Sequence, residues 1–285
     1  MVSASWSTAQ ANISLLFSEV PFERRPAAAA AAGFQAIECW WPFATATPSS
    51  SEVDAFVASI TDAGVQLRAM NFYAGDMAGG ERGIASHARR RGEFDDAVAV
   101  AIDIGARLGV TGFNALYGNR LPGVSATDQH DAGLRALAAA AEHADSIGAT
   151  VLVEPVSGIE AYPLKLAADA LTVIHGVRER MQHGRIALLA DLYHLTVNGD
   201  DVVRVVTEHA DQIGHVQVAD APGRHEPGSG SVPIVELVDL LEQHGYTGGI
   251  GLEYIPSGET VAGLSWLRPL VSGFGTTAAD VEVTR

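Results

Sequence analysis

Short apolar runs alternate with segments of helical periodicity along nearly the whole chain. The apolar runs predict β-strands at residues 12–17, 36–41, 65–72, 112–118, 150–155, 186–194, 213–220 and 248–256. Ala-rich or amphipathic stretches between them predict helices, for example at residues 25–33, 94–109 and 131–148. Several of these helices end in a glycine just before the next strand, as left-handed caps do: Gly33, Gly64, Gly109, Gly148 and Gly245.

Eight strand–helix units without a reversal of the pattern predict an α/β fold, a (β/α)8 barrel. A doubly wound open sheet is the alternative, but the chain has no phosphate-cradling G-x-G-x-x-G. The glycine-rich segment at residues 228–233 precedes a helix inside a late unit and is a weak nucleotide loop. The chain has 285 residues, is 47% hydrophobic and shows no obvious linker. We therefore expect one barrel domain at residues 1–272 and a frayed or surface-bound tail at residues 273–285.

The net charge and the amino-acid composition exclude several classes of binding partner and site. A formal net charge of −16 argues against a nucleic-acid-binding face, which needs a basic patch. The single cysteine, Cys39, excludes an internal disulfide and a multi-cysteine zinc site. No apolar run is long enough to span a membrane, and the N-terminal residues do not resemble a secretory signal. We expect a cytoplasmic enzyme with a small-molecule substrate and no nucleic-acid or membrane partner; a homo-oligomer is compatible with the sequence.

Four polar residues stand at equivalent positions near the ends of the last four predicted strands: Glu154, Asp191, Gln217 and Glu253. In a barrel, the carboxyl ends of the strands open into a shared active-site mouth. Three carboxylates would repel each other there without a cation, and oxygen ligands suit Mg²⁺ or Mn²⁺. Any one of the three carboxylates alone could be held by a nearby arginine or lysine, or by backbone amides. Their repetition on consecutive strands favours a divalent metal site.

Further candidates surround this site. His194, three residues after Asp191, could bind a substrate hydroxyl or support a ligand, or could be a structural histidine. The loop after the seventh strand carries Arg224 and Glu226, and the arginine suits an anionic oxygen, although a surface salt bridge is the alternative. The long connection at residues 71–86 contains Asn71 and Arg82 and is typical of a lid. Together, His194, Arg224, Glu226, Asn71 and Arg82 are the predicted substrate-binding residues.

The sequence resembles the hydroxypyruvate isomerase family of the xylose-isomerase-like TIM-barrel superfamily. The resemblance covers about residues 11–268 and is most specific at residues 11–22, 74–85, 191–194, 213–230 and 251–256. It implies that Glu154, Asp191, Gln217 and Glu253 hold the divalent metal. It also implies that Glu154 and Glu253 are the catalytic pair that transfers protons. The chain departs from the family after the second strand, around Asn71, after Glu154 and after Glu253, where a usual lysine is absent.

The implied chemistry moves a carbonyl between neighbouring carbons of a small hydroxy-aldehyde or hydroxy-ketone, such as hydroxypyruvate or a 2-oxo-tetronate. One carboxylate removes a carbon-bound proton, a cation stabilises the resulting enediolate, and the proton returns to the next carbon. A ketose 3-epimerase is the alternative within this class, and a non-catalytic barrel that binds a sugar acid is the alternative outside it. The superfamily also contains DNA-repair endonucleases, which use clustered histidines; Gln217 and the charge of −16 argue against that activity.

Overall fold

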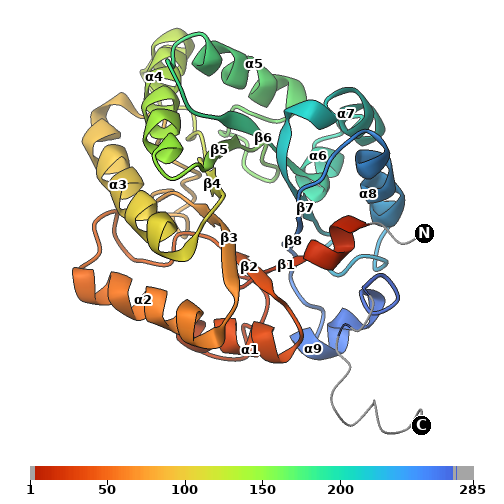
Figure 1. The fold of residues 1–285 in the computed structure, drawn as a ribbon. Helices are drawn as coiled ribbons and strands as arrows, with labels where there is room; N and C mark the ends of the chain where they lie inside the picture. The colour runs from red at the N-terminus through yellow and green to blue at the C-terminus, as the bar shows by residue number, and fades with distance from the viewer. Residues whose placement is uncertain (1–3, 272–273, 275–285) are drawn as a thin grey trace, which may run out of the picture.

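The computed structural model describes residues 4–271 and 274, so all of the predicted tail at residues 273–285 except residue 274 lies outside the described residues. Eight parallel strands close into a barrel in chain order (Figure 1). The strands are β1 (Gln10–Asn12), β2 (Ala36–Cys39), β3 (Gln66–Asn71), β4 (Gly112–Asn114), β5 (Thr150–Val153), β6 (Ile186–Asp191), β7 (Ile213–Val218) and β8 (Ile250–Leu252). The predicted (β/α)8 barrel is confirmed.

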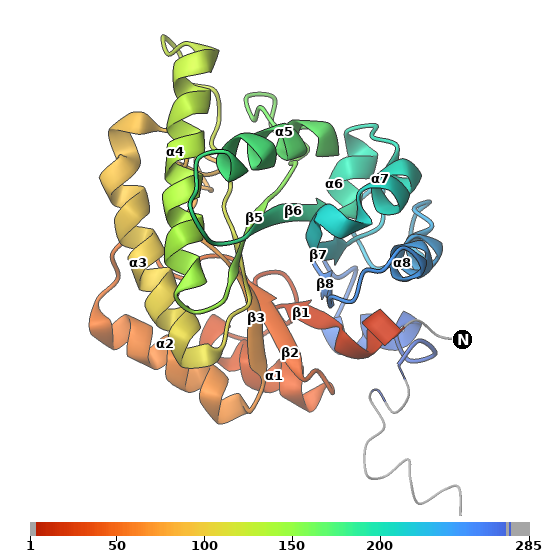
Figure 2. The same ribbon diagram turned by 45° about the horizontal axis from the view of Figure 1, so that its top comes forward.

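Helices surround the barrel on its outside (Figure 1). They are α1 (Arg25–Ala31), α2 (Ser50–Ala63), α3 (Arg91–Leu108), α4 (Ala126–Asp145), α5 (Ala167–Arg178), α6 (Leu192–Val197), α7 (Val202–Glu208), α8 (Ile234–Gln243) and α9 (Thr260–Gly263). Short 3-10 helices are η1 (Ala4–Thr8), η2 (Phe22–Arg24), η3 (Ala88–Arg90), η4 (Ala210–Gln212) and η5 (Leu264–Trp266). The tilted view shows the long helices α3 and α4 side by side (Figure 2).

Local signals explain where these helices begin and end. Ser49 and Glu52 form a reciprocal capping box at the start of α2, and Ser125 caps α4 by accepting from the backbone N–H of Asp128. Gly64 ends α2 and Gly109 ends α3 with φ of 69° and 73°, a region that favours glycine. The predicted left-handed helix ends are therefore present at these two glycines.

Most predicted strands end earlier in the structure, notably those at residues 112–118 and 248–256, which are β4 (Gly112–Asn114) and β8 (Ile250–Leu252). Two others continue as a different kind of structure. The expected strand at residues 12–17 is mostly a turn, because β1 ends at Asn12 and the backbone N–H of Leu16 bonds back to the Asn12 carbonyl at 2.8 Å. Ile13 and Leu16 are fully buried in this turn, so an apolar run here marks burial rather than an extended chain. The expected strand at residues 186–194 ends at Asp191, whose side chain caps α6.

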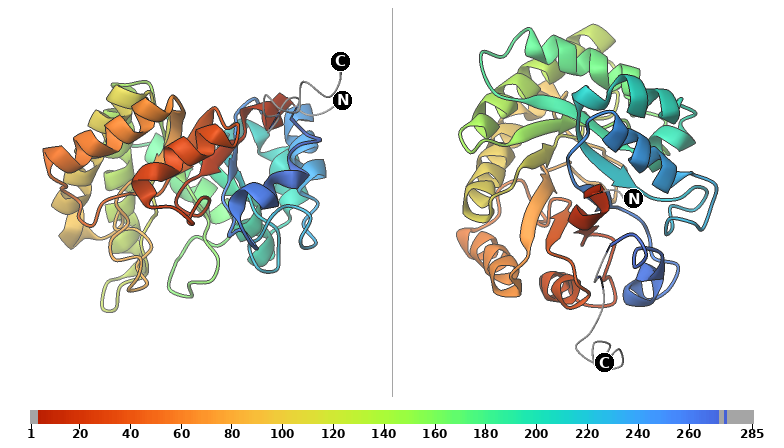
Figure 3. Two further views of the ribbon diagram at one scale, coloured as in Figure 1. Left: turned by 90° about the horizontal axis from the view of Figure 1, so that it is seen from below. Right: turned by 45° about the vertical axis from the view of Figure 1, so that its right-hand side comes forward.

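The loops that follow the strands project together from one end of the barrel (Figure 3). Parallel strands must all point their carboxyl ends the same way, so residues just after each strand meet there. This end holds the candidate site. Within the described part of the chain, no helix combines the length and apolarity needed to cross a membrane.

Candidate active site

The four residues predicted from the strand ends lie at the carboxyl ends of consecutive strands. Glu154 follows β5 directly, Asp191 ends β6, Gln217 lies in β7 and Glu253 follows β8. The register pairs Asp191 with Gln217, and Gln217 with Gly251. None of the four residues is more than 5% exposed. The barrel therefore brings three carboxylates and an amide into one buried region.

Glu154 is held by an amide from the neighbouring strand. Asn114, the last residue of β4, donates from Nδ2 to Glu154 Oε2 at 2.6 Å. Tyr162 donates its hydroxyl to the Glu154 carbonyl oxygen at 3.0 Å and so anchors the backbone. Burial raises the pKa of Glu154 well above its usual range, and the charges of Glu253 and Asp191 raise it further.

The two carboxylate oxygens of Asp191 make different contacts and so give the residue a double task. Its Oδ1 accepts from the backbone N–H groups of Tyr193 (2.8 Å) and His194 (3.3 Å), which caps α6 and fixes the carboxylate. Its Oδ2 lies 3.6 Å from His194 Nε2 and 3.4 Å from an Arg224 nitrogen. The sequence D-L-Y-H thus turns a strand into a helix while holding one carboxylate oxygen toward the site.

Glu253 accepts from two donors on other elements. Trp40, directly after β2, donates its indole N–H to Glu253 Oε1 at 3.0 Å, and Arg224 donates to the same oxygen at 2.7 Å. Burial raises the pKa of Glu253 to about 8; Arg224 opposes this shift and the Asp191 charge adds to it. Glu253 and Glu154 are thus two buried carboxyl groups with raised pKa values.

Arg224 supplies positive charge between two of these acids. One guanidinium nitrogen contacts both Glu253 and Asp191, and the guanidinium lies 5.5 Å from the centre of the Tyr193 ring. Arg224 adopts φ of 59°, which is uncommon for a residue with a side chain. This backbone conformation costs free energy, and the ion pairs of Arg224 with Glu253 and Asp191 help to hold it.

Arg224→Met is expected to lower the free energy of unfolding of the metal-free protein by about 2 kcal/mol. Breaking a fully buried ion pair costs roughly 3–5 kcal/mol, and we expect less because the Arg224 side chain is 18% exposed. Urea unfolding in EDTA measures the loss, with Arg180→Met, at a side chain 40% exposed, as control. Saturating Mn²⁺ should reduce the deficit of Arg224→Met, since a bound cation replaces the lost charge. Equal losses in the two variants would contradict this role.

His194 is oriented by Ser157, in the loop after β5. The Ser157 backbone N–H donates to His194 Nδ1 at 3.1 Å, and the Ser157 hydroxyl lies 2.7 Å from the same nitrogen. Since Nδ1 accepts, the neutral ring carries its proton on Nε2. That nitrogen lies 3.8 Å from Glu154 and 3.6 Å from Asp191. His194 therefore presents an N–H donor to the site rather than a free lone pair.

We expect His194 to stay neutral in the metal-free protein between about pH 5 and pH 8. Burial lowers its pKa to about 4, below the unfolded value of about 6.5. The neutral ring therefore contributes stability above about pH 6.5, and this contribution is lost as the pH falls toward 4. Long-range ¹H–¹⁵N NMR of the ring reports both the tautomer and the titration. A protonation midpoint above pH 6, or a proton on Nδ1, would contradict this geometry.

The donor set fits a divalent metal. Glu154, Asp191 and His194 offer ligand atoms within 4.8 Å of one another. Gln217 Oε1 is buried and finds no hydrogen-bond partner among the described residues, which is costly unless a ligand takes that place. Although His194 belongs to this cluster, its Nε2 carries a proton in the hydrogen-bonded tautomer, so the Gln217 oxygen is the better candidate ligand. Carboxylate and amide oxygens are ligands that Mg²⁺ and Mn²⁺ prefer.

A pocket of about 190 Å³ opens beside these acids. Glu154 and Glu253 line it, together with four of the predicted substrate-binding residues: Asn71, Arg82, His194 and Arg224. The structure places Glu226 elsewhere, where its carboxylate accepts from the Ser257 backbone N–H (2.8 Å) and hydroxyl (2.6 Å). Glu226 thus braces the loop after β8.

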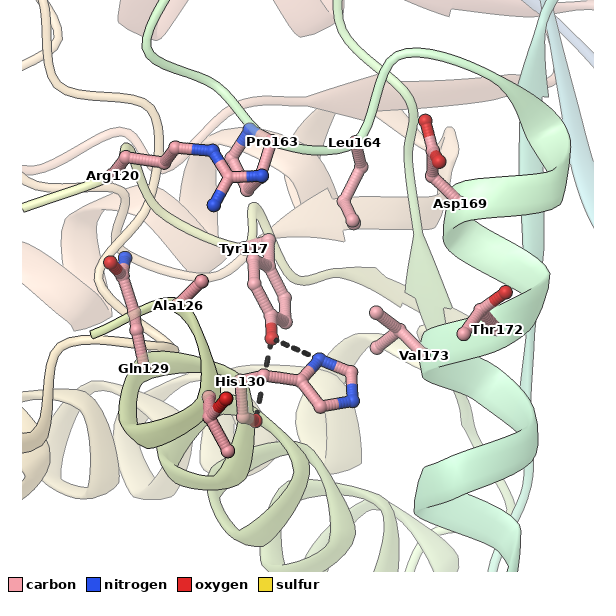
Figure 4. A pocket seen from close by; sticks show the side chains of 11 residues that line it. Tyr117, Arg120, Ala126, Gln129, His130, Pro163, Leu164, Asp169, Thr172 and Val173 are labelled. Atoms are coloured by element: carbon pink, nitrogen blue, oxygen red, sulfur yellow. Dashed lines mark hydrogen bonds between the residues drawn. The ribbon is translucent and has the colours of Figure 1, made fainter.

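A second pocket, of about 380 Å³, lies between α4 and α5 (Figure 4). Tyr117, His130, Arg120 and Asp169 are among its lining residues, and the Tyr117 hydroxyl lies 3.1 Å from His130 Nδ1. None of the four strand-end residues lines it. The chemistry indicated by the sequence therefore belongs to the smaller pocket.

Three residues that contact the predicted site residues were not themselves predicted: Trp40 bonds to Glu253, Asn114 to Glu154 and Ser157 to His194. Asn114 is a polar residue at the end of a strand, the same signal that identified Glu154. Trp40 and Ser157 stand just beyond strand ends in loops, where the sequence alone does not show which side chains turn inward.

Comparison with known proteins places the chain in a family. The family model described as a xylose isomerase-like TIM barrel matches residues 26–270. The chain is 47% identical to a Streptomyces coelicolor protein named "Putative hydroxypyruvate isomerase", with 90% of this chain and 94% of that protein aligned. It is 33% identical to the hydroxypyruvate isomerase of Escherichia coli, covering 91% and 97%. It is 32% identical to the 2-oxo-tetronate isomerase of Cupriavidus necator, covering 91% and 96%.

Solved structures agree on the fold. A Brucella melitensis structure described as AP endonuclease, family 2, has a TM-score of 0.84 and 30% identity, covering 93% of this chain and all of that one. A D-psicose 3-epimerase has a TM-score of 0.68 at 18% identity, covering 97% and 94%, and shows the fold alone. The sequence matches are the more specific finding. The chain belongs to the xylose isomerase-like TIM-barrel family and, within it, to the hydroxypyruvate isomerase family.

Proposed function

We propose that this chain is a metal-dependent isomerase that interconverts a small hydroxy-aldehyde and hydroxy-ketone of the hydroxypyruvate or 2-oxo-tetronate type. The observation that carries the proposal is the pair Glu154 and Glu253, two buried carboxyl groups that line one small pocket from different strands. The relatives that are named hydroxypyruvate isomerase and 2-oxo-tetronate isomerase support the substrate class.

The pocket suits a small anionic substrate. Its volume of about 190 Å³ is below the ~300–1,000 Å³ of pockets for drug-sized ligands. Arg82 and Arg224 both line it, and arginine pairs well with carboxylates. A three- or four-carbon hydroxy-oxo acid would bring one carboxylate to these arginines and its reacting carbons to the glutamates.

Glu154, Glu253 and His194 have different roles in the proposed proton transfer. The carbonyl moves by one carbon when one carboxylate takes a proton from the hydroxyl-bearing carbon and a proton returns to the former carbonyl carbon. We assign this proton transfer to Glu154 and Glu253; Asn114 donates to Glu154 Oε2 and Trp40 donates to Glu253 Oε1, which supports fixed positions for both carboxyl groups. His194 presents its Nε2–H to a substrate oxygen while the hydroxyl proton passes between the two oxygens.

A divalent cation such as Mg²⁺ or Mn²⁺, held by Glu154, Asp191, Gln217 and Glu253, would supply positive charge beside the two substrate oxygens. Arg224 neutralises part of the negative charge of these acids, since its guanidinium lies 2.7 Å from Glu253. The raised pKa of Glu154 means that this group holds a proton in the metal-free pocket at pH values where an exposed glutamate has lost it.

The proposal is tested by incubating the purified protein with Mn²⁺ or Mg²⁺ and a panel of hydroxypyruvate, a four-carbon 2-oxo acid and short ketoses. Proton NMR in deuterium oxide follows the position of the carbonyl and the exchange of carbon-bound protons. A moved carbonyl with exchange supports the isomerase. An inverted stereocentre without a moved carbonyl supports the alternative, a ketose 3-epimerase, which carboxylates directly after both β5 and β8 also permit.

Two other results would overturn the isomerase proposal. Cleavage of a DNA duplex with an abasic site, without turnover of any small molecule, would point to an endonuclease. Calorimetric binding of a sugar acid with neither turnover nor metal dependence would point to a non-catalytic barrel.

A further inference from the structure

A buried carboxylate lies inside the barrel, beneath the candidate metal site. Glu38, on β2, is 1% exposed, and three donors converge on its two oxygens. Asn12 Nδ2 lies 3.0 Å and Gln217 Nε2 2.7 Å from Oε1, and His215 Nε2 lies 2.6 Å from Oε2. In the closed barrel, β1 and β8 separate β2 from β7, so the contacts of Glu38 with His215 and Gln217 cross the interior.

This carboxylate decides which way the Gln217 amide faces. Gln217 Nε2 donates to Glu38 Oε1 at 2.7 Å, so the amide turns its NH₂ toward Glu38 and its oxygen away. The oxygen, Oε1, is the buried atom that has no hydrogen-bond partner among the described residues. The amide orientation is therefore set by a hydrogen bond on one side and left open for a ligand on the other.

Gly251, on β8, leaves the space that this carboxylate needs. A Cβ atom at this position would lie 2.5 Å from Glu38 Oε2 and 2.7 Å from Oε1, well inside van der Waals contact. Gly251 is the register partner of Gln217, so the missing side chain lies beside the amide that Glu38 orients. Glycine is needed here because of a close approach, and not because of its backbone conformation.

We propose that Glu38 is a positioning residue for the metal site: it orients the Gln217 amide so that Oε1, rather than the nitrogen, faces the cation. This inference rests on the proposed function, since it assumes that the strand-end residues bind a metal. Groups that orient metal ligands are typically worth about 10–100-fold in metal affinity. We assign Glu38 this indirect role because its side-chain hydrogen bonds, among the described residues, go to Asn12, His215 and Gln217.

Mn²⁺ titration of the substrate-free protein tests this, by calorimetry or by electron paramagnetic resonance. Glu38→Gln is expected to weaken Mn²⁺ binding by about 10–100-fold, because the new amide can donate to Gln217 Oε1 and turn it from the metal. In a Gln217→Ala background, Glu38→Gln should have little further effect, because no amide remains to be oriented. If Glu38 acted only through its negative charge, the same loss would appear in both backgrounds.

Gly251→Ala provides a second variant that keeps the charge of Glu38. The added Cβ should displace the Glu38 carboxylate and weaken Mn²⁺ binding about tenfold, an effect that also vanishes with Gln217→Ala. This variant decides the question if Glu38→Gln does not fold, as judged by thermal unfolding in EDTA. Unchanged Mn²⁺ affinity in the folded variants would overturn the role of Glu38 alone, whereas absence of Mn²⁺ binding by the unaltered protein would overturn the proposed function itself.

Discussion

Glu154→Gln is expected to slow exchange of the substrate α-proton by about 10²–10⁴-fold, the range that a positioned acid or base contributes. The amide keeps the volume of the side chain and still offers an oxygen to the Asn114 donor, which lies 2.6 Å from Glu154 Oε2. It cannot take up or deliver a proton. The measurement is proton NMR in deuterium oxide with saturating Mn²⁺, so that weakened metal binding does not limit the rate.

Glu160→Gln is the matched control for this variant. Glu160 lies in the loop after the same strand but is exposed, so its substitution should leave exchange unchanged. Thermal unfolding in EDTA should show that Glu154→Gln is at least as stable as the unaltered protein, since it removes a buried carboxyl group crowded by Glu253 and Asp191. Exchange at the unaltered rate in both Glu154→Gln and Glu253→Gln would contradict the assignment of the pair.

Asp191→Asn is expected to weaken Mn²⁺ binding by more than about 100-fold, because it removes charge from a direct ligand, whereas orienting groups alone are worth 10–100-fold. Stability should change little. The Asp191 cap of α6 uses Oδ1, and asparagine caps helices about as well as aspartate. Calorimetric titration with Mn²⁺ measures the affinity, and urea unfolding in EDTA measures the stability.

Asp62→Asn, at an exposed position in α2, is the control for the change in net charge. It should leave Mn²⁺ affinity unaltered. If Asp191→Asn binds Mn²⁺ as tightly as the unaltered protein, the metal is not at the ends of β5 to β8, and the roles of Gln217 and Glu253 fall with it.

The barrel could be predicted from the sequence because both of its signals are local. Strands and helices alternate with their own periodicities, and glycines such as Gly64 mark the helix ends. The first strand was misplaced because burial and extension give the same apolar pattern. Ile13 and Leu16 are buried in a turn, and no local signal distinguishes that turn from a strand.

The placement of Glu154 and Glu253 in one pocket could be predicted for a topological reason. Once the barrel is known, every residue after a strand lies at the same end. What could not be predicted is how the loops turn there. Glu226 and Arg224 are two residues apart in one loop, yet Arg224 bonds to the acids and Glu226 bonds to Ser257. The lid function expected of residues 71–86 stays a prediction.

Contacts across the barrel interior could not be predicted from the sequence, for a different reason. Glu38 and Gln217 are 179 residues apart, and strand periodicity says which face a residue takes but not which residue it meets. In the sequence, nothing distinguishes Asn12, Glu38 and His215 from other strand residues. Only the closed structure shows that they form one hydrogen-bonded group.

The double task of Asp191 limits how the site could be redesigned to bind a different ion. A replacement there must both cap α6 and carry negative charge: asparagine and serine cap without charge, and glutamate carries charge but is not among the preferred caps. Gln217 is not subject to this constraint, because its backbone continues an ordinary strand and only its amide is engaged. In the proposed metal site, Gln217 on β7 is therefore the ligand position most readily altered to change ion selectivity, together with the Glu38 carboxylate that faces it.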